Sequence, residues 1–170
     1  MKKSILLFFA TFATLVASAQ TKVEIDGIWY NLDENYWQAE VTFKGSSYDE
    51  YEEYSDAINI PATVTYGGVE YSVTSIGSCA FSECSSLTDI TIPENVTFIG
   101  WQVFQGCSNL TTITVEDGNY IYDSRDECNA IIASSSNTLI AGCSTTIIPE
   151  SVTSIGDDAF INCTKVRLLS

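Results

Sequence analysis

The chain contains no histidine, so carboxylates and cysteines are its main candidates for chemistry. Histidine is the usual general base near neutral pH and a frequent zinc ligand, and its absence excludes Ser-His-Asp and Cys-His catalysis and His-based zinc sites. Acidic pairs such as Asp49 with Glu52, or Asp157 with Asp158, remain. Two carboxylates that flank one bond are the catalytic groups of glycosidases. Nothing in the sequence places such a pair in a pocket, so we expect no catalytic residues and no enzyme activity.

Six cysteines are the other reactive groups. Cys84 recurs as Cys107 after 23 residues, and Cys163 follows 56 residues later. Recurrence at one repeat position is typical of a buried row, so we expect free thiols there. For Cys128 and Cys143, which bracket a predicted hairpin, a disulfide and two free thiols both remain open. No Cys-x-x-Cys pair occurs, and we expect no metal site and no cofactor.

The cysteine spacing belongs to an internal repeat of about 23 residues. A third copy, Pro149 to Cys163, matches Pro93 to Cys107 at an offset of 56, which is one period plus 33 inserted residues. Repeats of this length predict a solenoid in which equivalent residues stack from coil to coil. The recurring pairs are Ile76 and Ile99, Gly77 and Gly100, Phe81 and Phe104, Cys84 and Cys107, Leu87 and Leu110, and Ile90 and Ile113.

Alternating patterns outside the repeat predict three further β elements. Residues 22–44 alternate in two runs and predict an N-terminal β-hairpin, which we interpret as a cap on the first coil. Gly67-Gly68 lies between two alternating runs and predicts a hairpin that projects from the solenoid. A third hairpin is expected within an insertion at about 116–146. The predicted organisation is an N-terminal β cap with an acidic loop at 20–57 and repeats over 58–170.

The N-terminus predicts export. Lys2 and Lys3 precede an apolar run and the small residues 17–19, so residues 1–19 read as a signal peptide. The sequence contains seven basic residues, two of them in this peptide, and 22 acidic residues, so its net charge is −15. This charge disfavours nucleic acid and anionic membranes as partners. No later segment is apolar enough to span a bilayer, so we expect no membrane insertion.

The run I-x-I-P-x-x-V-T-x-I-G-x-x-A-F-x-x-C-x-x-L, found from Ile90 to Leu110 with Val103 for the usual Ala, resembles the BspA-type leucine-rich repeat of secreted surface proteins from Bacteroides-like bacteria. The resemblance extends over roughly residues 58–169. It implies a right-handed solenoid of parallel strands and, for some members, adhesion to host proteins or to other bacteria. The repeated motif positions are structural, so no catalytic residues carry over.

The candidate ligand-facing residues lie outside the repeated core. Trp101 takes a position that is polar in the other repeats, Ser78 and Asp157, and either packs on a neighbouring coil, which we favour, or faces a partner. The acidic segment 46–56 lacks the spacing of a calcium loop, and we interpret it as solvated, with tyrosines free to contact a ligand. The remaining candidates are the outward strand residues Thr88, Asp89, Thr91, Thr111, Thr112 and Thr114 and the loop residues Tyr48, Tyr51 and Tyr54.

Together these patterns predict a non-enzymatic binding module of mainly β structure that is secreted or held at the cell surface, with the periplasm left open. Its expected partner is an extracellular protein or glycan. The alternative is a structural or assembly component, or a fragment of a longer repeat protein, without a ligand of its own. Because the sequence shows no C-terminal cap, we also expect self-association through the last coil.

Overall fold

The structure is a computed structural model that describes residues 20–45, 54–161 and 163. These residues form thirteen β-strands and one 3₁₀ turn. The fold is therefore mainly β. No helix in the described ranges is long and apolar enough to cross a membrane.

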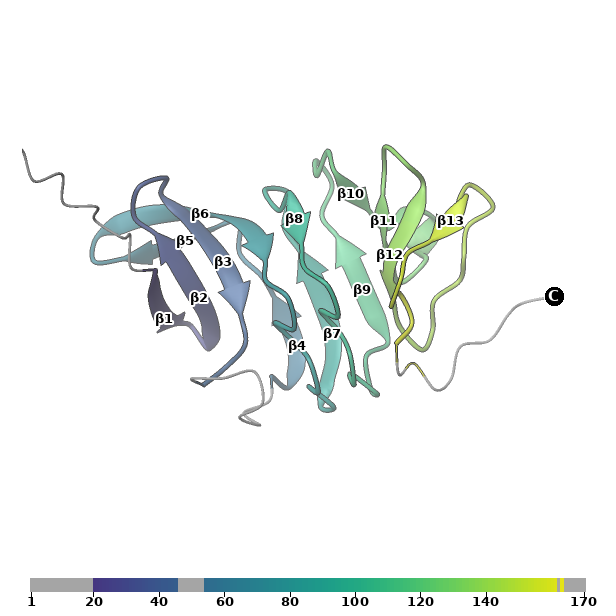
Figure 1. The fold of residues 1–170 in the computed structure, drawn as a ribbon, viewed down its shortest axis with the longest axis horizontal. Helices are drawn as coiled ribbons and strands as arrows, with labels where there is room; N and C mark the ends of the chain where they lie inside the picture. The colour runs from purple at the N-terminus through teal and green to yellow at the C-terminus, as the bar shows by residue number, and fades with distance from the viewer. Residues whose placement is uncertain (1–19, 46–53, 162, 164–170) are drawn as a thin grey trace, which may run out of the picture.

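The strands belong to three sheets. The six-stranded sheet contains β1 (Thr21–Ile25), β2 (Ile28–Asp33), β3 (Gln38–Thr42), β5 (Thr63–Tyr66), β6 (Val69–Ile76) and β8 (Phe98–Ile99). The three-stranded sheet contains β4 (Asp56–Asn59), β7 (Leu87–Ile92) and β9 (Thr112–Val115). The four-stranded sheet contains β10 (Tyr122–Asp123), β11 (Ala130–Ala133), β12 (Thr138–Gly142) and β13 (Ser154–Ile155). Figure 1 shows the strands spread along the long axis of the molecule, with β1–β3, β5 and β6 at one end, β4, β7 and β9 in the middle and β10–β13 at the other end.

The N-terminal segment is a three-stranded antiparallel meander, where we predicted a two-stranded hairpin. The first alternating run divides into β1 and β2 at Asp26 and Gly27, which have φ values of 50° and 84°. Positive φ at both central residues is the geometry of a type I′ hairpin turn, and Asp-Gly is a favoured sequence for it. The Asp-Gly pair therefore carried a turn signal that the alternation alone did not reveal.

The predicted hairpin at Gly67 and Gly68 is formed by β5 and β6, with φ values of 60° and 81° at the turn. It does not project from the fold as expected. The other edge of β6 pairs in parallel with β3, and the end of β6 pairs in parallel with β8. The N-terminal strands are thereby joined to the repeats through β6, because β6 can hydrogen-bond along both of its edges.

The predicted stacking of equivalent residues is present in the three-stranded parallel sheet. Ile58 of β4 is paired with Ile90 of β7, and Ile90 with Ile113 of β9. The ring of Phe81 stacks on that of Phe104 in the turns between strands. Both phenylalanines and the isoleucines at the centres of β7 and β9 are buried, so the repeated apolar residues form the core.

Successive turns of the repeat are joined by a regular set of backbone hydrogen bonds. The N–H groups of Cys79 and Phe81 donate to the carbonyls of Trp101 and Val103 in the next turn. This spacing brings the two turns so close that a Cβ built on Gly100 would lie 2.3 Å from the backbone nitrogen of Ser78. Position 100 is therefore glycine because the neighbouring backbone leaves no room for a side chain there.

The insertion contains the expected hairpin, formed by β11 and β12. On one side β11 pairs with β10, and on the other β12 pairs in parallel with β13, where Leu139 is opposite Ile155. The last turn then hydrogen-bonds to the inserted strand, because the Gly142 N–H donates to the Ala159 carbonyl. In an uninterrupted stack, the last turn would pair with the turn at 101–105. Here it pairs with strand β12 instead.

Candidate functional site

The outward positions of the three-stranded sheet form two rows that run across the strands. Asp89 of β7 is paired with Thr112 of β9 and, on the other side, with Ala57 of β4. Thr91 is likewise paired with Thr114 and with Asn59. These side chains are exposed or half-buried, whereas the alternate isoleucines of β7 and β9 are buried. The parallel register brings most of the predicted strand candidates onto one polar face.

Asp89 is tied into this face by its neighbours. Hydrogen bonds from the side chains of Thr88 and Thr112 hold the pKa of the Asp89 carboxyl below its usual value. The Thr111 hydroxyl, outside the two rows, donates to the Thr88 carbonyl. The Asp89 carboxylate is therefore a fixed negative charge on the face at neutral pH, held by a threonine from the same strand and one from the next strand.

Trp101 lies apart from this polar face, in the turn after β8. Trp101 is 63% exposed, so most of its surface faces solvent, although we favoured packing on a neighbouring coil. It lines a cleft of about 410 Å³ between two turns of the repeat, with residues 98–105 on one side and residues 156–159, 161 and 163 on the other. The inserted strand contributes Ile140, Ala141 and Gly142 to the lining. The structure thus brings Trp101 together with residues of the last repeat and of the insertion.

The two sides of the cleft meet at one polar contact. The Gln102 side-chain amide donates to the Asp158 carboxylate at 3.2 Å. Both residues have positive φ, 52° and 62°, as does Cys79 at the same repeat position. Asp157 and Asp158 line the cleft, and the described lining contains no basic residue. The cleft therefore combines an exposed aromatic side chain with a negative potential.

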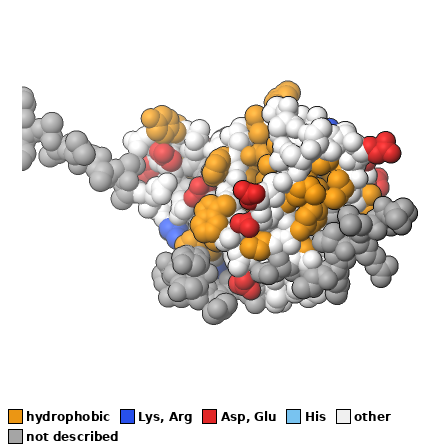
Figure 2. Space-filling model, turned by 45° about the vertical axis from the view of Figure 1, so that its right-hand side comes forward, with side chains coloured by type: hydrophobic (Ala, Val, Ile, Leu, Met, Phe, Trp, Pro, Cys, Tyr) orange, Lys and Arg blue, Asp and Glu red, His pale blue; other side chains and the backbone are white. Residues whose placement is uncertain are grey.

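Figure 2 shows a face on which hydrophobic side chains gather in separate groups with acidic side chains beside them, while basic side chains are scarce. Phe98, at the start of the same turn as Trp101, is 56% exposed. Sequence analysis did not select Phe98 or Gln102, and it considered Asp158 only as half of an acidic pair that nothing placed in a pocket. The repeat contained a signal for Phe98, because this large apolar residue stands where the preceding repeat has Ser75. The cleft itself depends on the inserted strand, which the repeat pattern does not place.

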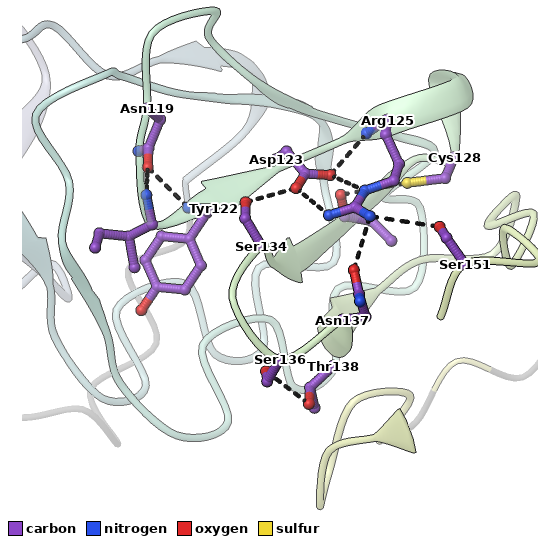
Figure 3. Close-up of polar contacts among 12 residues, drawn as sticks. Asn119, Tyr122, Asp123, Arg125, Cys128, Ser134, Ser136, Asn137, Thr138 and Ser151 are labelled. Atoms are coloured by element: carbon purple, nitrogen blue, oxygen red, sulfur yellow. Dashed lines mark hydrogen bonds and ion pairs between the residues drawn. The ribbon is translucent and has the colours of Figure 1, made fainter. Parts of the chain in front are cut away.

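A second hollow, of about 430 Å³, is lined by residues 115–119 and 122–127. Here Asp123 accepts hydrogen bonds from the Arg125 side chain and from the Ser134 hydroxyl, the latter at 2.6 Å (Figure 3). Arg125 also donates to Asn137, at 2.8 Å, and to Ser151. The network therefore joins β10, the β11–β12 turn and the last repeat.

Burial raises the pKa of the Asp123 carboxyl, but hydrogen bonds from Arg125 and Ser134 and the charge of Arg125 outweigh this and leave the pKa below its usual value. Asp123 is thus ionised and already paired within the fold. No group of acidic or sulfur ligands that could hold a metal occurs in the described part of the chain. We therefore assign this network a structural role.

Tyr54 is not a ligand-facing residue, which corrects the prediction for this tyrosine. Its side chain is 1% exposed and packs on Phe81, with ring centroids 4.9 Å apart. The hydroxyl donates to the Thr42 carbonyl at 2.7 Å and accepts from the Trp29 N–H at 2.9 Å. Tyr54 belongs to the core because it connects the N-terminal strands to the first repeat. Tyr48 and Tyr51 lie outside the described residues.

None of the six cysteines forms a disulfide, so the structure contains no bridge between Cys128 and Cys143. The two lie in different hydrophobic clusters, Cys128 in the smaller one and Cys143 in the main one. The Cys143 thiol donates to the Asn129 carbonyl, and the Cys128 thiol to the Ala130 carbonyl. Of the three repeat-position cysteines, Cys84 and Cys107 are buried and Cys163 is partly exposed.

Comparison with known proteins places this architecture among bacterial repeat proteins. The family model described as BspA type leucine rich repeat region (6 copies) matches residues 62–167. Comparison with curated proteins gives no match.

Three solved structures are similar. A leucine-rich repeat protein from Bacteroides capillosus shares 22% identity with a TM-score of 0.54, over 86% of this chain and 95% of that one. One from Bacteroides ovatus shares 30% identity with a TM-score of 0.52, over 85% of this chain and 39% of that one.

The third is a leucine-rich cell surface protein from Faecalibacterium prausnitzii, with 23% identity and a TM-score of 0.51, over 87% of this chain. This chain spans 30% of its length. The family match covers more than half of the sequence and includes the stacked turns and the parallel pair β7–β9. The chain belongs to the BspA-type leucine-rich repeat family.

Proposed function

We propose that this protein is a secreted or cell-surface adhesion module without enzymatic activity, which binds an extracellular protein or glycan. Family membership supports a binding role. The observation that carries the proposal is the polar face of β4, β7 and β9, where Asp89 and Thr112, and Thr91 and Thr114, are held opposite each other. Repeat proteins commonly bind partners through such faces, whose outward side chains vary while the core is maintained.

A binding screen with the mature chain tests this function. The chain from residue 20 onward is immobilised and exposed to extracellular-matrix proteins, mucin and cell-surface glycans. Replacing Thr91 or Thr114 by Arg should weaken retention of the partner, because a long charged side chain would cover the polar rows. Ser135→Arg is the matched control, since Ser135 is exposed at the β11–β12 turn. Retention of none of these partners, or equal retention by all variants, contradicts the proposal.

A second candidate function is assembly by self-association. It is favoured by Ile155, which is 53% exposed on β13, the outermost strand of the four-stranded sheet. An edge strand offers unpaired backbone groups to another chain. Sedimentation of the mature chain over a range of concentrations should then show an oligomer, and Ile155→Lys should shift it to monomer. A monomer at all concentrations contradicts this candidate.

A further inference from the structure

The turn that carries Trp101 has backbone donors without acceptors. In the preceding turn, Cys79 and Phe81 donate their N–H groups to the next turn. The residues at the same repeat positions are Gln102 and Phe104. Throughout the described chain, neither N–H has a hydrogen-bond acceptor. Such unsatisfied backbone groups are rare unless water or a ligand supplies the missing acceptor.

These two donors lie on the side of the turn where the cleft is. By analogy with Cys79 and Phe81, their N–H groups are directed toward the place of the following turn. In an uninterrupted stack, residues 124–128 would lie there, 23 positions after 101–105. Those residues do not line the cleft, and the last turn is hydrogen-bonded to β12 instead. The insertion has therefore left open the place of one turn.

The geometry of the donors suits a peptide. Gln102 and Phe104 are alternate residues, and an extended chain presents carbonyl groups on one side at every second residue. Addition of an extended segment to unpaired backbone groups is a common mode of peptide recognition. The bottom of the cleft is apolar, with Val103, Ile140 and Ala141 in its lining, so it can also accept an apolar side chain of that segment.

The charge of the cleft selects the class of peptide. Asp157 and Asp158 line it, no basic residue does so in the described chain, and the protein as a whole carries a net charge of −15. The exposed indole of Trp101 offers a face on which a lysine or arginine side chain gains a cation–π interaction. An acidic or phosphorylated segment would be repelled at the same position.

We propose that this cleft, bounded by Trp101, Gln102, Asp157 and Asp158, binds an extended basic segment of a protein partner that takes the place of the missing turn. The segment accepts hydrogen bonds from the N–H groups of Gln102 and Phe104, and its basic side chains contact Trp101 and the two aspartates. The proposal rests on the proposed binding function in that it names the chemistry of a partner. It uses a surface different from the polar face of β4, β7 and β9.

The test measures binding of a capped peptide of alternating lysine and valine to the mature protein at an ionic strength of about 0.15 M, where weak surface attraction is screened. A peptide of alternating glutamate and valine is the charge control. Trp101→Ala should weaken binding at least about tenfold, as expected for an interface Trp. Tyr120→Ala is the matched protein control, because Tyr120 is 93% exposed and lies outside the cleft lining. Trp101→Ala leaves the net charge unchanged, so non-specific electrostatic binding would not respond to it.

A second measurement reads the backbone donors directly. Amide hydrogen exchange should slow at Gln102 and Phe104 when the lysine–valine peptide is added, and the exposed turn at Ser135 should be unaffected. Failure to bind this peptide, equal binding by Trp101→Ala, or unchanged exchange at the two amides overturns the inference. If the native protein binds a glycan without slower exchange at the two amides, and Trp101→Ala loses this binding, the ligand of the cleft is a sugar and the peptide proposal is overturned.

The two proposals fail separately. If the peptide binds in the cleft but the mature chain retains no extracellular partner in the screen, the adhesion function is contradicted and the cleft assignment stands. If a partner is retained equally by Trp101→Ala and the peptide does not bind, the adhesion function stands and the cleft assignment is contradicted.

Discussion

Phe81 and Phe104 are 23 positions apart in the chain, and their rings stack with centroids 5.8 Å apart and planes 28° from parallel. Both are buried, and Tyr54 extends the row on the other side of Phe81. The repeated phenylalanines, together with Tyr54, therefore form a continuous row of packed aromatic rings. It runs from Tyr54, which contacts the N-terminal strands, to Phe104 in the turn that carries Trp101.

The first prediction concerns this row. Phe81→Ala should lower the free energy of unfolding by about 3–5 kcal/mol, because it removes a fully buried ring and leaves a cavity between two aromatic neighbours. Phe98→Ala is the same substitution at a half-exposed position and should cost much less. Urea unfolding followed by circular dichroism measures both. Similar losses for the two variants would contradict the role of the row.

The second prediction concerns the close approach of successive turns. Gly100→Ala should be strongly destabilising, because the new Cβ would collide with the backbone of Ser78, which cannot move without breaking the turn-to-turn hydrogen bonds. At the equivalent Gly77 a Cβ would lie 3.1 Å from the end of the Glu40 side chain, which can rotate away, and 3.2 Å from the Val41 carbonyl oxygen, a much milder contact than the 2.3 Å at Gly100. The midpoint temperature of thermal unfolding should therefore be much lower for Gly100→Ala than for Gly77→Ala. Equal midpoints would contradict the steric explanation.

The third prediction separates Tyr54 from the ligand-facing residues. Tyr54→Phe should lose about 1–3 kcal/mol, because the Trp29 N–H and the Thr42 carbonyl both lose their hydroxyl partner in a buried environment. Tyr66→Phe, at an exposed position, should change stability little. Partner retention in the binding screen should be the same for both folded variants. A selective loss of binding in Tyr54→Phe would restore Tyr54 as a contact residue.

The fourth prediction concerns pH. The pKa of Asp123 is lowered in the folded state, so its network stabilises the protein above the unfolded pKa of about 3.9, and this contribution is lost as pH falls through the folded pKa. Asp123→Asn should therefore be less stable than the native chain at neutral pH, and the difference should shrink in acid.

Unfolding measured from pH 7 down to about pH 2 tests this dependence, since the range spans the unfolded pKa of aspartate. Glu150→Gln is the control, because Glu150 is exposed and outside the network. A stability difference between Asp123→Asn and the native chain that does not change with pH would show that the carboxylate charge is not what stabilises the insertion.

The sequence alone was sufficient for those features that depend on residues one repeat apart. Ile90 opposite Ile113, Phe81 on Phe104 and the glycine turn at Gly67 and Gly68 were all predicted, because stacking places equivalent residues side by side and two adjacent glycines favour a tight turn. The polar rows of the strand candidates follow from the same register. These relationships repeat along the chain and can be read as a period.

Tertiary structure decided the features that join segments without a common period. Tyr54 is buried because the N-terminal strands pack on the first repeat, and Cys128 and Cys143 form no disulfide and lie in different hydrophobic clusters. The cleft at Trp101 exists because β12 pairs with β13 and hydrogen-bonds to the backbone of the last turn, which therefore does not pair with the backbone of residues 101–105. The physical reason is that a periodic sequence determines which residues stack. The place of an insertion depends instead on which strand edges have backbone groups free to hydrogen-bond with it.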